Sequence, residues 1–273
     1  MNLKNTDIFG RKIFFIEPNT TFIPLSFMEN LCTLGYESHI VGHDGGSISE
    51  RVKKIAGAFP DALIFFNIDA SAPEMSWIQF IRQLRQENPD LAVGVVFEAT
   101  NQDRAHHVEM DYGNDITPSA GCIALSHGKE KENFDTILSA LEKSGAKGRR
   151  NNIRAKCDEG STISFKHGSA TFHARLDDIN ILHLCCILDN TESIRSMKIY
   201  DKFRDVHLAV NGLEFKSDIV LIMKRVKMGV PTAIFMFIKK PDDEPGLEAE
   251  LESQLNKKIY EITSKEFSLF LNK

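Results

Sequence analysis

The chain has 273 residues, 42% of them hydrophobic and 26% charged, which is the composition of a globular protein long enough for two domains, each with its own core. Its formal net charge of −5 argues against a protein that coats nucleic acid, and no stretch reaches the roughly 18 consecutive apolar residues of a membrane span. An N-terminus without an apolar run predicts no signal peptide, and five scattered cysteines predict neither disulfides nor a zinc site, so the expected compartment is the cytoplasm.

Over the first half of the sequence, short apolar runs alternate with segments of helical periodicity. The predicted strands are residues 13–16, 37–41, 62–66, 92–97 and 122–125, and the predicted helices are residues 23–34, 49–59, 77–87 and 133–143. This alternation predicts a doubly wound α/β sheet, which we assign to residues 1–145. Only a short helix is expected between Asn101 and Ala120. The length and order of these elements resemble the receiver domain of response regulators.

The residues at the ends of the predicted strands depart from the receiver pattern. A receiver has an acidic pair after its first strand, an acceptor aspartate after the third and a lysine after the fifth. This chain has the single carboxylate Glu17, then Asn67 with Asp69 shortly after it, and finally Ser126-His127-Gly128. Little is left to hold a divalent cation, so we expect no metal and interpret the domain as a degenerate receiver that makes contacts. Asp69 is expected to cap the next helix, and its phosphorylation is the alternative.

The second half of the sequence changes from helical to alternating periodicity and is assigned to residues 146–273. The predicted strands are residues 162–166, 170–175, 184–188, 205–210, 213–225 and 232–238. Asn211-Gly212 is a strong hairpin signal, and six strands with tight turns predict a small antiparallel β-barrel. A last helix is expected over residues 247–259. The apolar residues from Phe267 to Leu271 are expected to pack on a domain or on a second subunit.

A basic segment, Arg149-Arg150-Asn151-Asn152-Ile153-Arg154, lies between the two predicted domains. A guanidinium fork can hold a phosphate through two hydrogen bonds and can also pair with or stack on guanine. Further along, the chain reads Asp178-Ile179-Asn180-Ile181-Leu182-His183. An RxxxR segment that leads into a barrel, followed by a sequence similar to DxSxxG, resembles the PilZ family of cyclic di-GMP receptor domains.

The resemblance implies a nucleotide-binding site. In that family the arginines hold the phosphates and guanine faces of cyclic di-GMP, and the DxSxxG turn seats a guanine edge. Asn180 stands in the place of the serine and keeps a donor and an acceptor, whereas His183 stands in the place of the glycine, so a stacking role or a rebuilt turn is expected there. The ligand-binding residues implied in this way are Arg149, Arg150, Arg154, Asp178, Asn180 and His183.

The expected function is that of a non-enzymatic cytoplasmic signalling protein. It binds cyclic di-GMP at the interdomain RxxxR segment and changes its domain arrangement to control a partner in motility or signalling. The alternative is a degenerate PilZ adaptor that binds no nucleotide and acts by protein–protein interaction. No nucleophile–base set or phosphate-cradling glycine loop is visible, so no enzyme and no cofactor are expected. The expected partners are cyclic di-GMP, a protein not identified by the sequence and, as a further option, a second copy of the chain.

Overall fold

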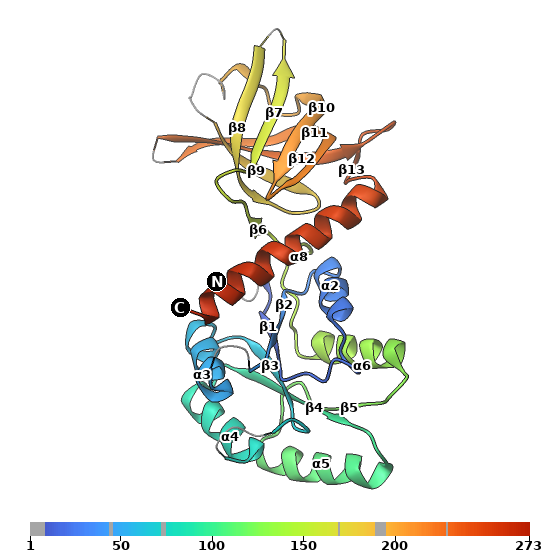
Figure 1. Ribbon diagram of the computed structural model, residues 1–273. Coiled ribbons are helices and arrows are strands. Elements are labelled where there is room, and N and C mark those ends of the chain that lie inside the picture. Colours follow the sequence, from blue (N-terminus) through green and yellow to red (C-terminus); the bar gives the residue numbers. More distant parts are fainter. Residues whose placement is uncertain (1–8, 44–45, 72–74, 169, 189–194, 228) are drawn as a thin grey trace. The chain divides into compact units, whose positions relative to one another are not determined.

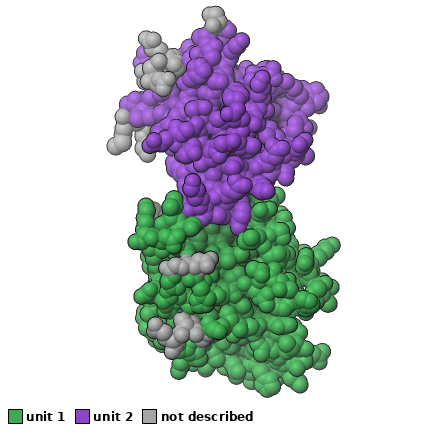
Figure 2. Space-filling view, viewed as in Figure 1, with its two compact units in different colours: residues 1–151, 267–273 green, residues 152–266 purple. Residues whose placement is uncertain are grey.

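The computed structural model divides the chain into two compact units (Figure 2). The first unit consists of residues 1–151 and 267–273, and the second of residues 152–266. The residues that the structure describes are 9–43, 46–71, 75–168, 170–188, 195–227 and 229–273. The predicted boundary after residue 145 remains a prediction; the compact units divide within the basic segment, after Asn151.

The first unit is a parallel sheet of five strands with helices on both faces, within the residues described (Figure 1). Its strand order is β2-β1-β3-β4-β5. The strands are β1 (Ile13–Ile16), β2 (Ser38–Val41), β3 (Leu63–Asn67), β4 (Ala92–Glu98) and β5 (Cys122–Leu125). The helices are α2 (Leu25–Thr33), α3 (Ile48–Ala58), α4 (Trp77–Glu87), α5 (Gln102–Asp115) and α6 (Glu130–Lys143). This order confirms the predicted doubly wound, receiver-like unit.

Continuous apolar strands explain why this sheet is covered on both faces. Every residue of β3 is buried, because successive side chains point alternately to the two helical layers. Phe14 and Phe66 face the layer of α3, α4 and α5. Phe15 stacks on Phe65 with ring centroids 5.1 Å apart. Gly94 lies opposite Phe65 in the next strand, and a Cβ there would come within 2.3 Å of the Phe65 ring. The glycine in β4 therefore makes room for the stacked rings.

Helix α5 is longer than the sequence suggested. It spans 14 residues, Gln102–Asp115, where only a short helix was expected. The expectation was wrong because this helix buries little: Val108 and Tyr112 are its buried residues, so its apolar periodicity is weak. Asn101 begins it by accepting a hydrogen bond from the backbone N–H of Arg104 at 2.8 Å.

The second unit is a closed antiparallel barrel, as predicted. In the described part of the chain, six strands form the ring in the order β11-β10-β7-β8-β9-β12, and pairing between β11 and β12 closes it. The strands are β7 (Thr162–His167), β8 (Ala170–Ile179), β9 (His183–Leu188), β10 (Lys202–Val210), β11 (Leu213–Lys227) and β12 (Val230–Lys239). The short strands β6 (Ala155–Lys156) and β13 (Glu244–Pro245) pair with β8 and β12.

An aromatic cluster fills the barrel, and a tight hairpin sets its register. The rings of Phe165, Phe203 and Phe235 lie 4.7 to 5.7 Å apart, centroid to centroid. Asn211 and Gly212 both adopt positive φ, 46° and 86°, which is the conformation of a two-residue hairpin turn. The hairpin predicted at these two residues is therefore confirmed, and it joins β10 to β11.

Helix α8 spans Ala249–Leu271, well beyond the predicted range of 247–259. The predicted end of this helix at residue 259 was wrong because the apolar residues that follow continue the helix rather than forming a separate tail. Phe267 and Leu271 belong to the core of the first unit, and the Phe267 ring stacks on His39 with centroids 4.4 Å apart. The expectation that these last apolar residues pack on a domain is confirmed for Phe267, Phe270 and Leu271, whereas Leu269 is 55% exposed. Among the helices described, none combines the length and the apolar character needed to cross a membrane.

Candidate functional site

Arg154 lies at the beginning of the second unit, immediately before strand β6. This strand pairs antiparallel with the end of β8, so that Ala155 stands opposite Ile179 and Lys156 opposite Asp178. Ala155 is fully buried, whereas its two neighbours in the sequence are exposed. Because side chains alternate along a strand, the burial of Ala155 turns Arg154 and Lys156 toward solvent on one face.

Both of these cations contact carboxylates of β8. Arg154 Nη1 donates to Asp178 Oδ1 over 3.2 Å, and Lys156 Nζ donates to Asp177 Oδ1 over 3.1 Å. The hydrogen bond to Asp177 raises the pKa of Lys156, so the amine stays charged. The Arg154 and Asp178 side chains are 33% and 19% exposed, and ion pairs open to solvent contribute about 0.2–1 kcal/mol. Arg154 is thus oriented by a weak pair that an anionic ligand can replace.

The link between β8 and β9 is a tight turn held by Asn180. Its backbone N–H donates to the His183 carbonyl at 2.8 Å. Its side-chain Oδ1 accepts from the backbone N–H groups of Leu182 and His183 at 2.8 and 2.7 Å. Asn180 is 5% exposed, and its amide oxygen is committed to the turn. Asn180 therefore shapes the loop between Asp178 and His183.

His183 begins strand β9 opposite Met236 and has an extended backbone, outside the left-handed region. A histidine at this place of the DxSxxG-like sequence therefore carries no backbone strain. Burial lowers the pKa of His183, and the positive charge of Arg154 lowers it further. The imidazole is accordingly neutral near pH 7, and a neutral planar ring can stack on a base.

Arg149 and Arg150 belong to the first compact unit. The Arg150 guanidinium carbon lies 4.2 Å from the centroid of the Phe9 ring, which is a cation–π contact. Phe9 is 56% exposed, and Arg149 is exposed as well. Of the six predicted site residues, the structure brings four together around the turn of the second unit, and it holds Arg150 against an aromatic ring of the first.

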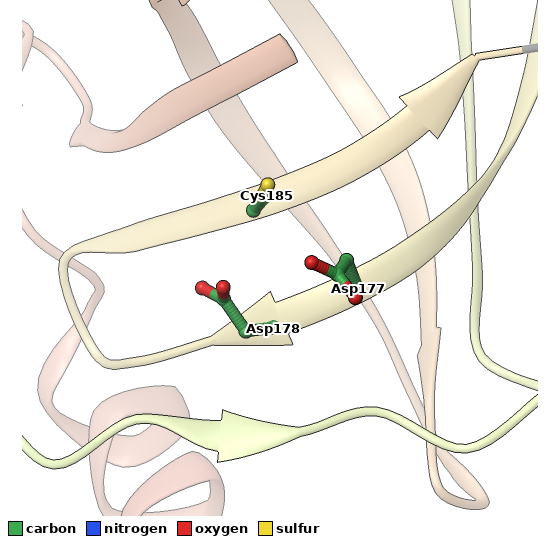
Figure 3. A group of neighbouring side chains, drawn as sticks. All are labelled: Asp177, Asp178 and Cys185. Carbon is green, nitrogen blue, oxygen red and sulfur yellow. The ribbon is translucent and has the colours of Figure 1, made fainter. Parts of the chain in front are cut away.

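Two residues that the sequence analysis did not single out adjoin this turn. Asp177 and Cys185 approach Asp178, with potential ligand atoms of all three within 4.8 Å of one another (Figure 3). A register shift in β8 between Leu176 and Asp178 brings the two adjacent carboxylates to the same edge. Burial, followed by the negative charges of Asp178 and Asp177, raises the pKa of Cys185 to about 11. With a protonated thiol and both carboxylates paired to cations, the cluster favours ion pairing over metal binding.

In the first unit, Asp69 is bonded in a way that the sequence did not predict. Its Oδ2 accepts from the backbone N–H of Glu98 at 2.6 Å, and its Oδ1 pairs with Arg104. The next helix, α4, is instead capped by Ser76, whose side chain accepts from the Gln79 N–H. The expectation that Asp69 caps this helix was therefore wrong, because Asp69 ties β4 and α5 to the end of β3.

Two further polar residues at the strand ends of the first unit, Asn67 and Ser126, are also bonded internally. Asn67 is 8% exposed, and its Nδ2 donates to the Glu17 carbonyl over 2.7 Å. After β5, the backbone of Ser126 both donates to and accepts from the Asn133 side chain at 3.0 Å. These side chains hold the loops of the sheet edge together.

Comparison by sequence finds no family model and no curated protein that matches the chain. Comparison by structure finds YcgR of Escherichia coli in complex with c-di-GMP, with 17% identity, coverage of 44% of this chain and 49% of YcgR, and a TM-score of 0.37. It also finds MrkH of K. pneumonia in complex with c-di-GMP, with 11% identity, coverage of 45% and 55%, and a TM-score of 0.38.

A third similar structure is the signal receiver domain of an HD domain-containing protein of Pseudomonas fluorescens Pf-5. It has 13% identity, the match covers 50% of this chain and 99% of that domain, and the TM-score is 0.36. The chain spans about half the length of the YcgR and MrkH chains that it matches, 49% and 55% respectively.

Proposed function

We propose that this protein is a non-enzymatic cytoplasmic receptor for cyclic di-GMP, and that the nucleotide binds at the RxxxR segment and the turn between β8 and β9. Ligand binding changes the arrangement of the two units and so controls a protein partner in motility or signalling. The observation that carries the proposal is the pairing of Arg154 with Asp178 beside the turn built by Asn180. It joins the two halves of the PilZ-like motif, which are far apart in the sequence, in one place.

Each residue of the turn has a distinct part in the proposed complex. Arg154 exchanges its weak carboxylate pair for a phosphate and keeps its orientation. Asp178, once released, accepts hydrogen bonds from the N–H groups of a guanine edge. His183 is neutral and half-buried, and it offers a ring for stacking. Asn180 contributes indirectly by holding the turn in shape, because its side-chain oxygen already accepts hydrogen bonds from backbone N–H groups.

Calorimetric titration of the full chain with cyclic di-GMP tests the proposal. The original chain should bind, and Arg154→Ala should weaken binding by about 1.5–3 kcal/mol, or roughly tenfold to a hundredfold, because a charged hydrogen bond to phosphate is lost. Arg82→Ala is a matched control, since Arg82 is also an exposed arginine paired with a carboxylate, Asp115, at 2.8 Å. An original chain that is folded and does not bind micromolar nucleotide would refute the receptor function.

An adaptor that binds no nucleotide is the second candidate, and the hairpin of β11 and β12 favours it. Met223, Val226 and Val230 are 49%, 51% and 43% exposed on neighbouring strands. The apolar C-terminal residues Phe267 and Leu271 are buried in the first unit and offer no such surface. The hairpin is therefore the surface to test: Val226→Asp should abolish partner capture, whereas an Arg150→Ala, Arg154→Ala double variant should leave it unchanged.

A further inference from the structure

Four adjacent strands of the barrel, β8, β9, β12 and β11, carry two parallel rows of outward-facing side chains. In the first row the register aligns Arg175, Ile187, Thr232 and Arg225. In the second it aligns Asp178, Cys185, Ile234 and Met223. The residues beside the first row, Ala174, Cys186 and Ala233, are 5%, 0% and 0% exposed, so they fill the barrel and the rows lie on its outer side. Within the rows, Thr232 and Cys185 are covered by neighbouring side chains, with 7% and 3% of their surface exposed.

The two rows are neighbours on this surface and contain the candidate site. Cys185 and Ile187 are two residues apart on β9, as are Met223 and Arg225 on β11, so the rows lie roughly 7 Å apart. Asp178, the partner of Arg154, occupies one end of the second row. Arg225 occupies the far end of the first row, with apolar or small side chains between it and the turn. The surface thus has an apolar floor with charged groups at its edges, as ligand sites commonly do.

The charges of this surface leave an excess of positive charge. The carboxylates of Asp177 and Asp178 are each already paired with a cation of the β6 region. Arg175 and Arg225 are exposed, and among the residues that the structure describes neither side chain has a hydrogen bond or an ion pair. The cations of this face are Arg154, Lys156, Arg175 and Arg225, and its carboxylates are Asp177 and Asp178. Their formal charges sum to two positive charges, which equal in magnitude the two negative charges on the phosphodiesters of a cyclic dinucleotide.

Arg225 is also electrostatically close to the turn. Burial and the charges of two aspartates raise the pKa of the Cys185 thiol, and the positive charges of Arg225 and Arg154 act against this rise. Two guanidiniums from separate elements, one before β6 and one on β11, thus act on the same thiol. The outer face between them is the surface on which a ligand held by Arg154 would rest.

We propose that Arg225 is a ligand-binding residue of this site and holds the phosphate of the cyclic dinucleotide that Arg154 does not reach. The proposal rests on the proposed receptor function and adds to it a contact from the barrel wall, outside the RxxxR segment and the turn. Ile187 and Ile234, which are both partly exposed, form the floor under the ligand. Arg175, at the opposite end of the first row, contributes long-range attraction.

Titration of the full chain with cyclic di-GMP, repeated with Arg225→Ala and Arg225→Gln, tests the proposal. Each variant should weaken binding at least tenfold, and Arg225→Lys should restore part of the loss because it keeps the charge and loses the fork. Lys216→Ala is the control: Lys216 is exposed on the same strand, roughly 30 Å from Arg225, and its loss removes one positive charge elsewhere. The unfolding midpoint of each variant, measured in parallel, shows that the exposed substitution leaves the barrel folded.

The outcomes separate this inference from the function on which it rests. Binding by the original chain that Arg225→Ala and Arg225→Gln leave within twofold would overturn the role of Arg225 and keep the receptor. An equal loss in Lys216→Ala would also overturn it, because the effect would then be one of net charge. If the original chain does not bind at all, the receptor and the role of Arg225 both fall.

Discussion

Polar side chains are used in opposite ways at the strand ends of the first unit and on the outer face of the barrel. In the first unit, Asn67 and Asp69 are bonded to neighbouring loops and strands, so the edge that carries chemistry in a receiver is here committed to its own structure. On the barrel, Arg154 is paired weakly and openly, and Arg225 lies exposed on the same face.

The difference shows how to separate a structural polar residue from a binding one. A buried amide that satisfies a loop carbonyl costs stability when it is removed, whereas an exposed guanidinium does not. Substitutions at the strand ends of the first unit should therefore change the free energy of unfolding and leave ligand affinity alone, and substitutions on the barrel face should do the reverse. Three measurements sharpen this contrast.

The largest expected effect on stability is that of Asn67→Ala. It removes the hydrogen bond to the Glu17 carbonyl and the one that Asn67 Oδ1 accepts from the Asp69 backbone N–H, so the free energy of unfolding should fall by about 1–3 kcal/mol in a urea titration. Asn114→Ala is the matched control, because Asn114 is exposed on α5, and it should change stability by less than about 0.5 kcal/mol. Equal effects of the two variants would contradict the structural role of Asn67.

The second measurement is the stability of the first unit below neutral pH. Burial lowers the pKa of His39, and of the charged groups that face it Glu37 acts against this and Lys12 adds to it. The buried Nδ1 of His39 has no partner, so protonation would place an unpaired N–H between aromatic rings. Because the folded pKa lies below the unfolded value of 6.5, the unfolded state binds more protons between the two, and stability falls as pH drops below 6.5.

Thermal unfolding between pH 7.5 and about 5 checks this expectation. The midpoint should decrease as the pH falls below the unfolded pKa of histidine, and His39→Phe should remove that part of the decrease while keeping a ring against Phe267. A pH dependence that is the same in the original chain and in His39→Phe would show that other groups cause it.

The smallest expected effect on stability is that of Arg154→Ala. The pair with Asp178 is open to solvent, so the free energy of unfolding should change by at most about 1 kcal/mol. The same variant should raise the pKa of His183, since the charge of Arg154 is one of the two causes that lower it. An NMR titration of the His183 ring measures this shift; an unchanged pKa would mean that the guanidinium does not lie beside the imidazole.

Strands and their order were predictable because they depend on local patterns. Runs such as Leu63–Asn67 are buried on both sides, and the Asn211-Gly212 turn needs two residues at positive φ. Both features can therefore be recognised from residues that are neighbours in the sequence. The helix after Asn101 was underestimated because it presents few buried residues. The continuation of α8 to Leu271 was missed because the surface that covers its last turn comes from the first unit.

The candidate site was predictable only where a motif supplied the residues. Arg154 and Asp178 came from the resemblance to RxxxR and DxSxxG. Asp177 and Cys185 depend on a register shift in β8, and the position of Arg225 depends on pairing across three strand interfaces. None of these alignments has a signature in the spacing of the residues, because they are set by barrel closure rather than by any single segment.

The burial of Phe267 and Leu271 in the first unit has a consequence for the order of events on the ribosome. Residues 1–151 emerge first, but the layer that covers Phe14 and His39 arrives only after the entire barrel has been synthesised. The aromatic surface of the first unit therefore stays uncovered until α8 has been translated. A nascent chain stalled within the barrel should therefore expose that surface to chaperones, and release of the finished chain should close it.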